Sequence, residues 1–156
     1  MHHPLYDRNR RLVVAAPDGG TLVVVGDVSG KGLRAAMVVS VVIGALLNRR
    51  SSRPGEVLAE LNRAITGQLD GGFVTCLAVL LEPGGRIVAA NAGHVRPYTC
   101  GREVEVPDGL PLGIVAEAGY EEAEWRLDEG AMHRAVQRHH SRRGARCRHA
   151  GHQGRS

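Results

Sequence analysis

The most constraining feature of the sequence is a strand pattern that runs through glycines into a long apolar segment. TLVVVGDV, Thr21–Val28, is short and β-branched, with PDGG before it and glycines after it, which predicts a buried strand. From Lys31 to about Asn48, apolar residues dominate over a length that only a helix fills, and few positions are polar enough to face water. We therefore expect a strand, a tight turn that contains Asp27, and a buried helix.

The next segment predicts a second, amphipathic helix. SSRPGEVLAELNRAITGQL places Ser52 at the expected N-cap and Pro54 in the first turn. Its apolar residues recur at helical spacing and fall on one face: Val57, Leu58, Leu61, Ile65 and Leu69.

Antiparallel strands are expected after the two helices. FVTCLAVLLEPGGRIVAANAG holds two apolar runs on either side of Pro83-Gly84-Gly85, which is a strong hairpin signal. RPYTCGREVEVP predicts a shorter strand pair that turns at Gly101. One strand, two helices and several antiparallel strands do not alternate as a parallel sheet requires. The order favours an α+β layered domain.

The charge divides the chain in two, although 156 residues are about the length of one domain. Residues 131–156 hold seven arginines, five histidines and no acidic residue, so removing their +7 from the net +4 leaves −3 for residues 1–130. This tail has almost no aliphatic residues and no periodicity, which leaves disorder, a nucleic-acid arm and a translation frameshift as interpretations. It has no aromatic side chain to stack on bases, so a nucleic-acid partner is the least favoured. We expect a domain over residues 1–130 and a separate tail over residues 131–156.

Nothing in the sequence predicts a membrane segment or a secretory leader. The longest apolar run, Ala35–Leu47, is too short to span a bilayer, and the basic N-terminus has no apolar stretch behind its charges. Cys76, Cys100 and Cys147 show no CxxC spacing, which fits reduced thiols. We expect a cytoplasmic protein with no membrane partner.

The glycine-rich turn around Asp27 has two interpretations on chemical grounds. It is not a nucleotide P-loop, because the spacing from Gly26 to Lys31 is one residue short and Gly32 stands where the hydroxyl is needed. A carboxylate at a strand end, next to a carbonyl that glycines leave free to turn, offers the oxygen ligands that hard divalent cations prefer. The alternative is that Asp27 caps the following helix.

Three motifs, taken in order, resemble the bacterial stage II sporulation protein E type of metal-dependent protein phosphatase, within the protein phosphatase 2C (PPM) superfamily. VVVGDVSGKG precedes the apolar helix, a strand pair ends in Asn91-Ala-Gly-His94-Val-Arg-Pro97, and GLPLGI follows at Gly109–Ile114. Their order and spacing agree with the family from about Leu5 to Gly130. The resemblance implies a sandwich of antiparallel β-sheets flanked by helices.

The resemblance also assigns metal ligands. It places the family's bridging carboxylate on Asp27 and a carbonyl ligand on Val28, which would hold Mn²⁺ or Mg²⁺, two ions per site in complete members. Aligning the family's opening G-G-D-x-Y-D element puts its end on Tyr6 and Asp7, and Pro4 then stands where the first Asp belongs. The family's later T-D-G segment and C-terminal Asp have no counterpart before the arginine- and histidine-rich tail. We therefore expect a domain that is incomplete at both ends.

Three further residues carry weaker expectations. Lys31 could hold an anionic substrate near the helix start, or it could be a solvated lysine. His94 could contact substrate, although a hydrogen-bonded structural role is favoured because no partner is visible in the sequence. Ser29 stands where relatives often have a histidine that acts as a general acid, and we interpret it as a turn residue.

The resemblance implies a function in bacterial signal transduction. The reaction would be metal-dependent hydrolysis of phosphoserine or phosphothreonine in a regulatory protein, such as an anti-sigma-factor antagonist, by a water activated between two cations. The alternative is a module that keeps the fold and binds the same partner without turnover. The missing ligands make this alternative a serious one.

Overall fold

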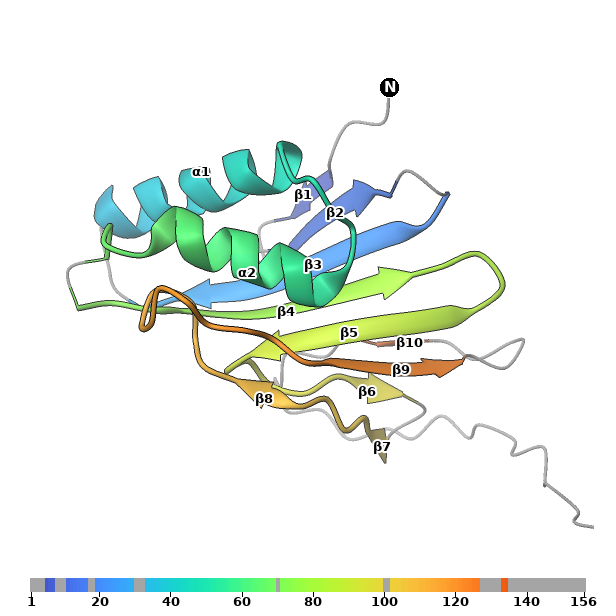
Figure 1. Cartoon of the computed structure of the whole chain (residues 1–156). Coiled ribbons are helices and arrows are strands. Elements are labelled where there is room, and N and C mark those ends of the chain that lie inside the picture. The colour runs from blue at the N-terminus through green and yellow to red at the C-terminus, as the bar shows by residue number, and fades with distance from the viewer. Residues whose placement is uncertain are drawn as a thin grey trace, which may run out of the picture.

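Two sheets and two helices make up the described part of the chain in the computed structural model, which comprises residues 5–7, 11–16, 19–29, 33–69, 71–99, 102–126 and 133–134 (Figure 1). The large sheet has the order β1-β2-β3-β4-β5-β8, and β9 also pairs with β5. The small sheet has the order β10-β6-β7. The strands are β1 (Leu5–Asp7), β2 (Arg11–Ala15), β3 (Thr21–Val28), β4 (Val74–Leu81), β5 (Arg86–Ala92), β6 (Tyr98–Thr99), β7 (Arg102–Glu103), β8 (Asp108–Gly109), β9 (Glu122–Arg126) and β10 (His133–Arg134). The α+β class is confirmed.

Strand β5 pairs with three other strands, β4, β8 and β9. Its first edge pairs antiparallel with β4. Its second edge is shared, because residues 86–90 pair antiparallel with β9 and residues 91–92 pair parallel with β8. The end of β5 therefore contacts two segments that are remote in sequence.

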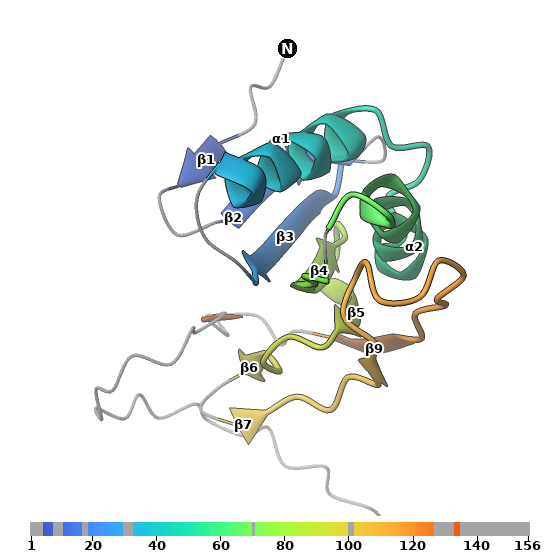
Figure 2. The same ribbon diagram turned by 90° about the vertical axis from the view of Figure 1, so that its left-hand side faces the viewer.

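The two helices, α1 (Leu33–Leu47) and α2 (Pro54–Ile65), cover the same face of the large sheet (Figures 1 and 2). Figure 2 shows β6 and β7 on the opposite side of that sheet. The core lies under the helices, where alternate strand residues meet the apolar face of α2. It includes Leu22, Val24, Ala78, Leu80, Val88 and Ala90 from the sheet and Val57, Leu58, Leu61 and Ile65 from α2.

The predicted strands are confirmed where local chemistry is strong. Strand β3 has the predicted bounds, and the Pro83-Gly84-Gly85 turn joins β4 to β5. Gly84 and Gly85 have φ values of 84° and 79°, a region that disfavours other residues. The short pair β6 and β7 forms on either side of the predicted turn at Gly101. Strand β10 lies inside the predicted tail and pairs with β6.

Helix α1 differs from the prediction of a buried helix. Among its described side chains, Val38 and Leu46 are buried, whereas Met37 is 60% and Leu47 is 50% exposed. Among the described elements, the helix packs mainly against α2 and less against β3. Its apolar composition therefore exceeds what the described elements cover. Among the described residues, no helix is both long and apolar enough to cross a bilayer.

The predicted cap of α2 is also wrong. Arg53, not Ser52, is the N-cap residue, and its side chain makes no capping hydrogen bond. Pro54 occupies the first turn as predicted, and a residue before proline is pushed to extended backbone, which makes Arg53 the boundary. The N–H of Arg53 donates instead to Ser51 Oγ at 3.0 Å.

Candidate metal centre

Asp27 lies at the end of β3, on the face of the large sheet that is turned away from the helices. Side chains alternate along a strand, and Val24 and Val28 belong to the core under the helices, so Asp27 points to the other face. Thr75 stands directly opposite Asp27 in the β3–β4 register. Asp27 is exposed, so a cation from solvent can reach this end of the strand.

Two neighbours of Asp27 hold the strand end in place. A Cβ on Gly26 would stand 2.9 Å from the carbonyl oxygen of Thr75, so the strands approach too closely there for a side chain. The Ser29 hydroxyl donates to the carbonyl of Phe73 at 2.7 Å and accepts from the N–H of Phe73 at 2.6 Å. Because backbone groups engage this hydroxyl both ways, the geometry favours Ser29 as a turn residue over a general acid.

The carbonyl of Val28 faces away from β4. Val74, the register partner of Val28, exchanges both of its backbone hydrogen bonds with Leu112, at 2.8 and 3.0 Å. In an antiparallel ladder this makes Val28 and Val74 a non-hydrogen-bonded pair, so the peptide groups of Val28 point to the opposite edge of β3. The register with β2 has ended before this point. The orientation is compatible with a carbonyl ligand next to Asp27.

The loop after β5 is closed by the amide of Asn91 and places His94 next to β4. Asn91 Oδ1 accepts from the N–H of His94 at 2.8 Å, and Asn91 Nδ2 donates to the carbonyl of His94 at 2.9 Å. Gly93 has a φ of 64°, and a Cβ there would stand 2.7 Å from Pro111 Cγ. Only glycine satisfies both conditions, so the Asn-Ala-Gly-His sequence builds one specific loop.

The ring of His94 joins the loop to the strand that carries Thr75. His94 Nδ1 lies 3.0 Å from Thr75 Oγ1. Burial lowers the pKa of His94 below its usual value of 6.5, and the negative charge of Asp27 partly offsets this shift. The ring is therefore mainly neutral at pH 7. Asp27, Thr75 and His94 form one polar cluster from three separate segments.

Arg96, two residues after His94, is engaged by acidic side chains. Its Nη2 lies 2.6 Å from Asp108 Oδ2, and its Nη1 lies 3.5 Å from Glu103 Oε1. Asp108 Oδ1 also accepts from Asn91 Nδ2 at 3.3 Å. These contacts link the Asn91 loop to β8 and neutralise the charge of Arg96.

The Gly109–Gly113 segment acts as a brace for this end of the sheet. Leu112 is fully buried and pairs with Val74 through the two backbone hydrogen bonds described above. Gly113 has a φ of 89°, and a Cβ there would stand 2.6 Å from Leu69 Cδ1. Gly109 is equally constrained, because its Cβ would stand 2.6 Å from the carbonyl oxygen of Asn91.

Asn62 holds the following loop, and sequence reasoning did not single it out. Its side chain is fully buried in α2; Oδ1 accepts from the N–H of Gly113 at 2.8 Å. Nδ2 donates to the carbonyls of Val115 and Ala116, at 2.7 and 2.9 Å. The available signal was a polar residue set beside Leu61 on the apolar face of the helix.

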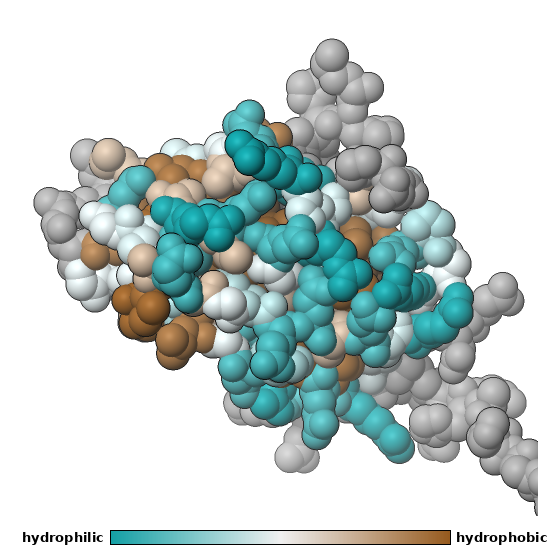
Figure 3. Space-filling view, viewed as in Figure 1, coloured by the Kyte–Doolittle hydropathy of each residue, from teal (hydrophilic) through white to brown (hydrophobic). Residues whose placement is uncertain are grey.

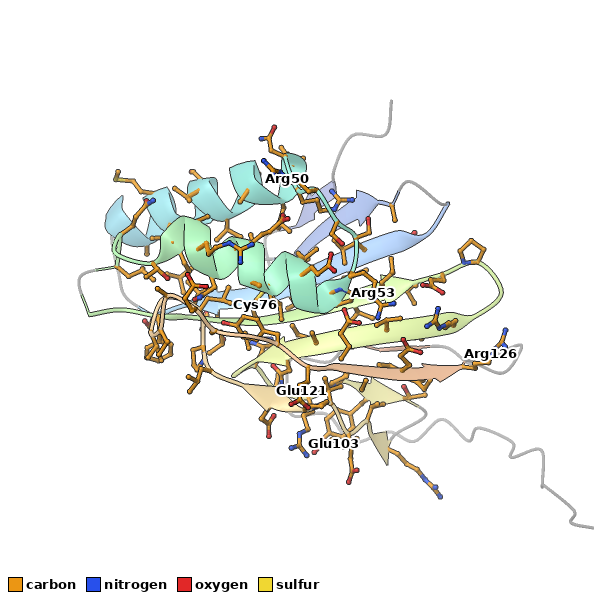
Figure 4. All side chains as sticks on the ribbon, in the orientation of Figure 1. Arg50, Arg53, Cys76, Glu103, Glu121 and Arg126 are labelled. Carbon is orange, nitrogen blue, oxygen red and sulfur yellow. The ribbon has the colours of Figure 1, made fainter. Side chains whose placement is uncertain are left out.

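Of the predicted site residues, Asp27, Val28 and His94 lie at the same end of the sheet. Lys31 and Pro4 lie outside the described residues, as does the tail apart from His133 and Arg134. Tyr6 and Asp7 are described only as strand β1. Cys76, labelled in Figure 4, is a buried core residue whose thiol pKa is raised to about 12 by burial, so it is unreactive.

The described donors fit the chemistry of a hard divalent cation but are few. A carboxylate and a carbonyl are ligand types that Mg²⁺ and Mn²⁺ prefer, with water in the remaining positions. In the described ranges, no three His, Cys, Asp or Glu side chains come together to hold a metal ion. Two such oxygens are too few to confine two ions.

Comparisons with solved structures show the fold. The RsbU and RsbW domains of Rv1364c from Mycobacterium tuberculosis share 30% identity with a TM-score of 0.63, over 76% of this chain and 35% of that one. The SiaA-PP2C domain of Pseudomonas aeruginosa shares 21% identity with a TM-score of 0.60, over 79% and 53%. A serine/threonine phosphatase of S. agalactiae shares 14% identity with a TM-score of 0.53, over 81% and 72%. The chain thus spans about a third of the first structure and about half of the second.

The family comparison covers more of the chain than any one motif. No curated protein matches the sequence. The family model described as Stage II sporulation protein E (SpoIIE) matches residues 17–133, which include Asp27, the Asn91 loop and the Gly109–Gly113 brace. The chain therefore belongs to the SpoIIE family.

Proposed function

We propose that this domain hydrolyses phosphoserine or phosphothreonine in a protein, in a reaction that depends on Mn²⁺ or Mg²⁺. The observation that carries the proposal is the position of Asp27 at an open strand end, beside the outward-facing carbonyl of Val28, within a SpoIIE-family fold. Asp27 and Val28 would hold the cation. The chemistry needed from it is Lewis-acid polarisation of the phosphoryl oxygens and activation of a water molecule.

The other residues of the cluster would orient the substrate. The neutral ring of His94 can offer a hydrogen bond to a phosphoryl oxygen, while Thr75 holds its Nδ1 side. Lys31 stays a proposed anion contact near the start of α1. The partner we propose is a phosphorylated regulatory protein of the bacterial cytoplasm; support comes from the Mycobacterium tuberculosis structure, which holds an RsbU and an RsbW domain.

A second candidate function is a module that binds the same partner without turnover. It is favoured by one observation, the lack of any three-ligand group among the described residues. A single carboxylate and carbonyl would bind a cation weakly, because each ligand depends on its neighbours to fix the ion.

The deciding experiment combines a metal-binding readout with a phosphatase readout. Manganese binding is followed by electron paramagnetic resonance, and phosphate release is measured with p-nitrophenyl phosphate and a phosphoserine peptide. We expect Asp27→Asn to weaken both by about 100-fold or more, since even loss of a supporting group around a metal costs 10- to 100-fold. The exposed Glu121, labelled in Figure 4, offers the matched control Glu121→Gln, which should leave both unchanged.

The outcomes separate the two candidates. Manganese-dependent turnover that is lost in Asp27→Asn supports the phosphatase. Background turnover in all three proteins, together with binding of the phosphopeptide, supports the module without catalysis and contradicts the phosphatase.

A further inference from the structure

The ring of His94 is held through one of its two nitrogens. Nδ1 lies 3.0 Å from Thr75 Oγ1, and in the described part of the chain Nε2 has no hydrogen-bond partner. The loop that carries the ring is fixed separately, because the Asn91 amide bonds to both the N–H and the carbonyl of His94. With the loop fixed, the chemistry of the ring depends on which nitrogen carries the proton.

The Thr75 hydroxyl favours one of the two tautomers. A neutral imidazole carries one proton, so one ring nitrogen donates a hydrogen bond and the other accepts one. Within the described ranges, His94 Nδ1 is the one hydrogen-bonding neighbour of this hydroxyl. If Nδ1 carried the proton, it would donate to Oγ1, and the hydroxyl proton would have no acceptor there. If the hydroxyl donates to Nδ1, both groups are satisfied and the ring proton lies on Nε2.

Strand register brings the hydroxyl to the ring. Thr75 stands opposite Asp27 in the β3–β4 pairing, and an isolated bridge pairs Cys76 with Gly93, the residue before His94. Side chains alternate along β4, so Thr75 lies on the face of Asp27, whereas Cys76 belongs to the core under the helices. Burial lowers the pKa of His94, and the negative charge of Asp27, which lies near the ring, opposes this shift. A paired strand therefore fixes the hydroxyl beside the candidate metal centre.

Exposed apolar side chains of the loop between β8 and β9 take no part in this arrangement. Asn62 of α2 holds residues 113–116 on the face of the sheet that the helices cover. The loop that contains them forms the brown area at the lower left of Figure 3. The orientation of a substrate at Asp27 is therefore left to the polar groups on the other face.

We propose that Thr75 is a positioning residue, whose hydroxyl donates to Nδ1 and fixes His94 as the tautomer with its proton on Nε2. The inference rests on the proposed function, because the Nε2–H is offered to a non-bridging oxygen of the phosphoryl group. In this tautomer His94 presents a hydrogen-bond donor and no lone pair to the substrate. It therefore binds the phosphoryl group instead of accepting a proton. Thr75 acts through His94 and touches no reacting atom.

The tautomer is measured by long-range ¹H–¹⁵N NMR of the imidazole nitrogens in the full chain, at a pH of about 8, where histidine rings are neutral. His94→Gln assigns the His94 signals. The wild-type chain should show a protonated Nε2, an unprotonated Nδ1 and widely separated nitrogen shifts. In Thr75→Val, which removes the hydroxyl and keeps the branched shape, the two shifts should converge because both tautomers are populated. Thr75→Ser should restore the separation.

The matched control is Thr21→Val, which makes the same change at the other end of the sheet, where β3 begins. It should leave the His94 shifts as they are in the wild-type chain. Thermal unfolding checks that each variant is folded.

Hydrolysis of p-nitrophenyl phosphate with Mn²⁺ tests the consequence for the reaction. Thr75→Val should lower kcat/KM by about tenfold, the size of one neutral hydrogen bond, and Thr75→Ser should stay within about twofold of the wild type. Manganese binding, followed by electron paramagnetic resonance, should be equal in all of these proteins, because Thr75 is not a ligand.

Two results of the NMR experiment overturn the proposal: separated shifts that persist in Thr75→Val, and a wild-type ring with its proton on Nδ1. A loss of kcat/KM that Thr75→Ser does not rescue also overturns it, because Thr75 would then have a packing role only. Failure of the proposed function gives a different result. Absence of turnover in every protein, with shifts that converge in Thr75→Val, refutes the phosphatase and supports Thr75 as the residue that sets the tautomer.

Discussion

The two ends of the large sheet are held together by different chemistry. At the end where the β4–β5 hairpin turns, Arg86 lies 3.1 Å from Glu82 and 2.7 Å from Glu124. Figure 4 shows Arg126 at this end. At the end that carries Asp27, the main stabilising contacts are hydrogen bonds made by the side-chain amides of Asn62 and Asn91 and by the hydroxyl of Ser29. Their hydrogen bonds run mostly to backbone groups.

The charged contacts of the hairpin end are expected to stabilise the fold less than the neutral hydrogen bonds of the other end. The ion pairs at the hairpin end are partly exposed, and such pairs contribute little and are screened by salt. The buried amides at the other end are individually more important, because removing one leaves backbone groups buried without a partner. These neutral hydrogen-bonding groups also hold the loops around the polar cluster without placing a positive charge beside Asp27. The charge of Arg96 is neutralised by Asp108 and Glu103.

The largest effect is expected at Asn62. Asn62→Ala removes three hydrogen bonds to the loop after β8 and should lower the free energy of unfolding by about 3 kcal/mol, measured by urea denaturation. The control is Asn48→Ala, because Asn48 makes an exposed bond to the carbonyl of Gly44. Its change should stay below about 0.5 kcal/mol. Equal losses of free energy of unfolding in the two variants would show that the buried hydrogen bonds contribute no more than the exposed one.

Gly93 should give the next largest effect. Gly93→Ala places a Cβ against Pro111 on backbone with positive φ, which should reduce the free energy of unfolding by about 2 kcal/mol. A Cβ on Gly119 meets nothing within 4 Å, so Gly119→Ala serves as the control. Matching urea midpoints for the two variants would show that the Asn91 loop is not constrained as described.

A smaller effect, a pH dependence of stability, is expected from His94 at the end that carries Asp27. Because burial lowers the pKa of His94, the unfolded chain binds the proton more tightly, so His94 reduces stability as pH falls below 6.5 toward its folded pKa. Replacing it in His94→Gln should therefore flatten the pH dependence of the urea midpoint in that window. An unchanged slope would mean that the ring is not buried beside Asp27 in solution.

The smallest effect is expected at the hairpin end. Arg86→Met should lower the thermal midpoint only slightly, and less so in about 0.5 M salt, because exposed ion pairs are screened. Arg86 holds the pKa of Glu124 below its usual 4.5, so the pair stabilises the fold above pH 4.5 and this contribution is lost as pH falls through the folded pKa. If Arg86→Met lowered the free energy of unfolding more than Asn62→Ala does, the hairpin end would be the more strongly stabilised of the two, contrary to the expected order.

Local patterns predicted the elements whose causes are local. The bounds of β3, the Pro83–Gly85 hairpin and the apolar face of α2 follow from periodicity and turn chemistry within a few residues. The N-cap of α2 was missed, because Pro54 moved the boundary to Arg53. The exposure of α1 was missed for another reason: apolar composition shows that a helix can be buried, not whether another element lies on its outer side.

The residues of the candidate site also divide into those that a local motif predicted and those that only tertiary contacts reveal. Asp27 and the Asn-Ala-Gly-His loop were visible in the sequence as motifs, and their roles as ligand and substrate contact stay predictions. Thr75 and Asn62 were not visible, because nothing adjacent to them in the chain indicates what they contact. Thr75 meets His94 only through the β3–β4–β5 register, and Asn62 meets the loop after β8 only through the packing of α2.

The sequence by itself determined the order of elements, the glycine turns and the carbonyl and carboxylate proposed as cation ligands, since these depend on short-range sterics and side-chain chemistry. Tertiary structure alone decided that Asp27, Thr75 and His94 come together on the face away from the helices. The physical reason is that strand register and helix packing are set by the whole core, which joins residues that no local pattern connects.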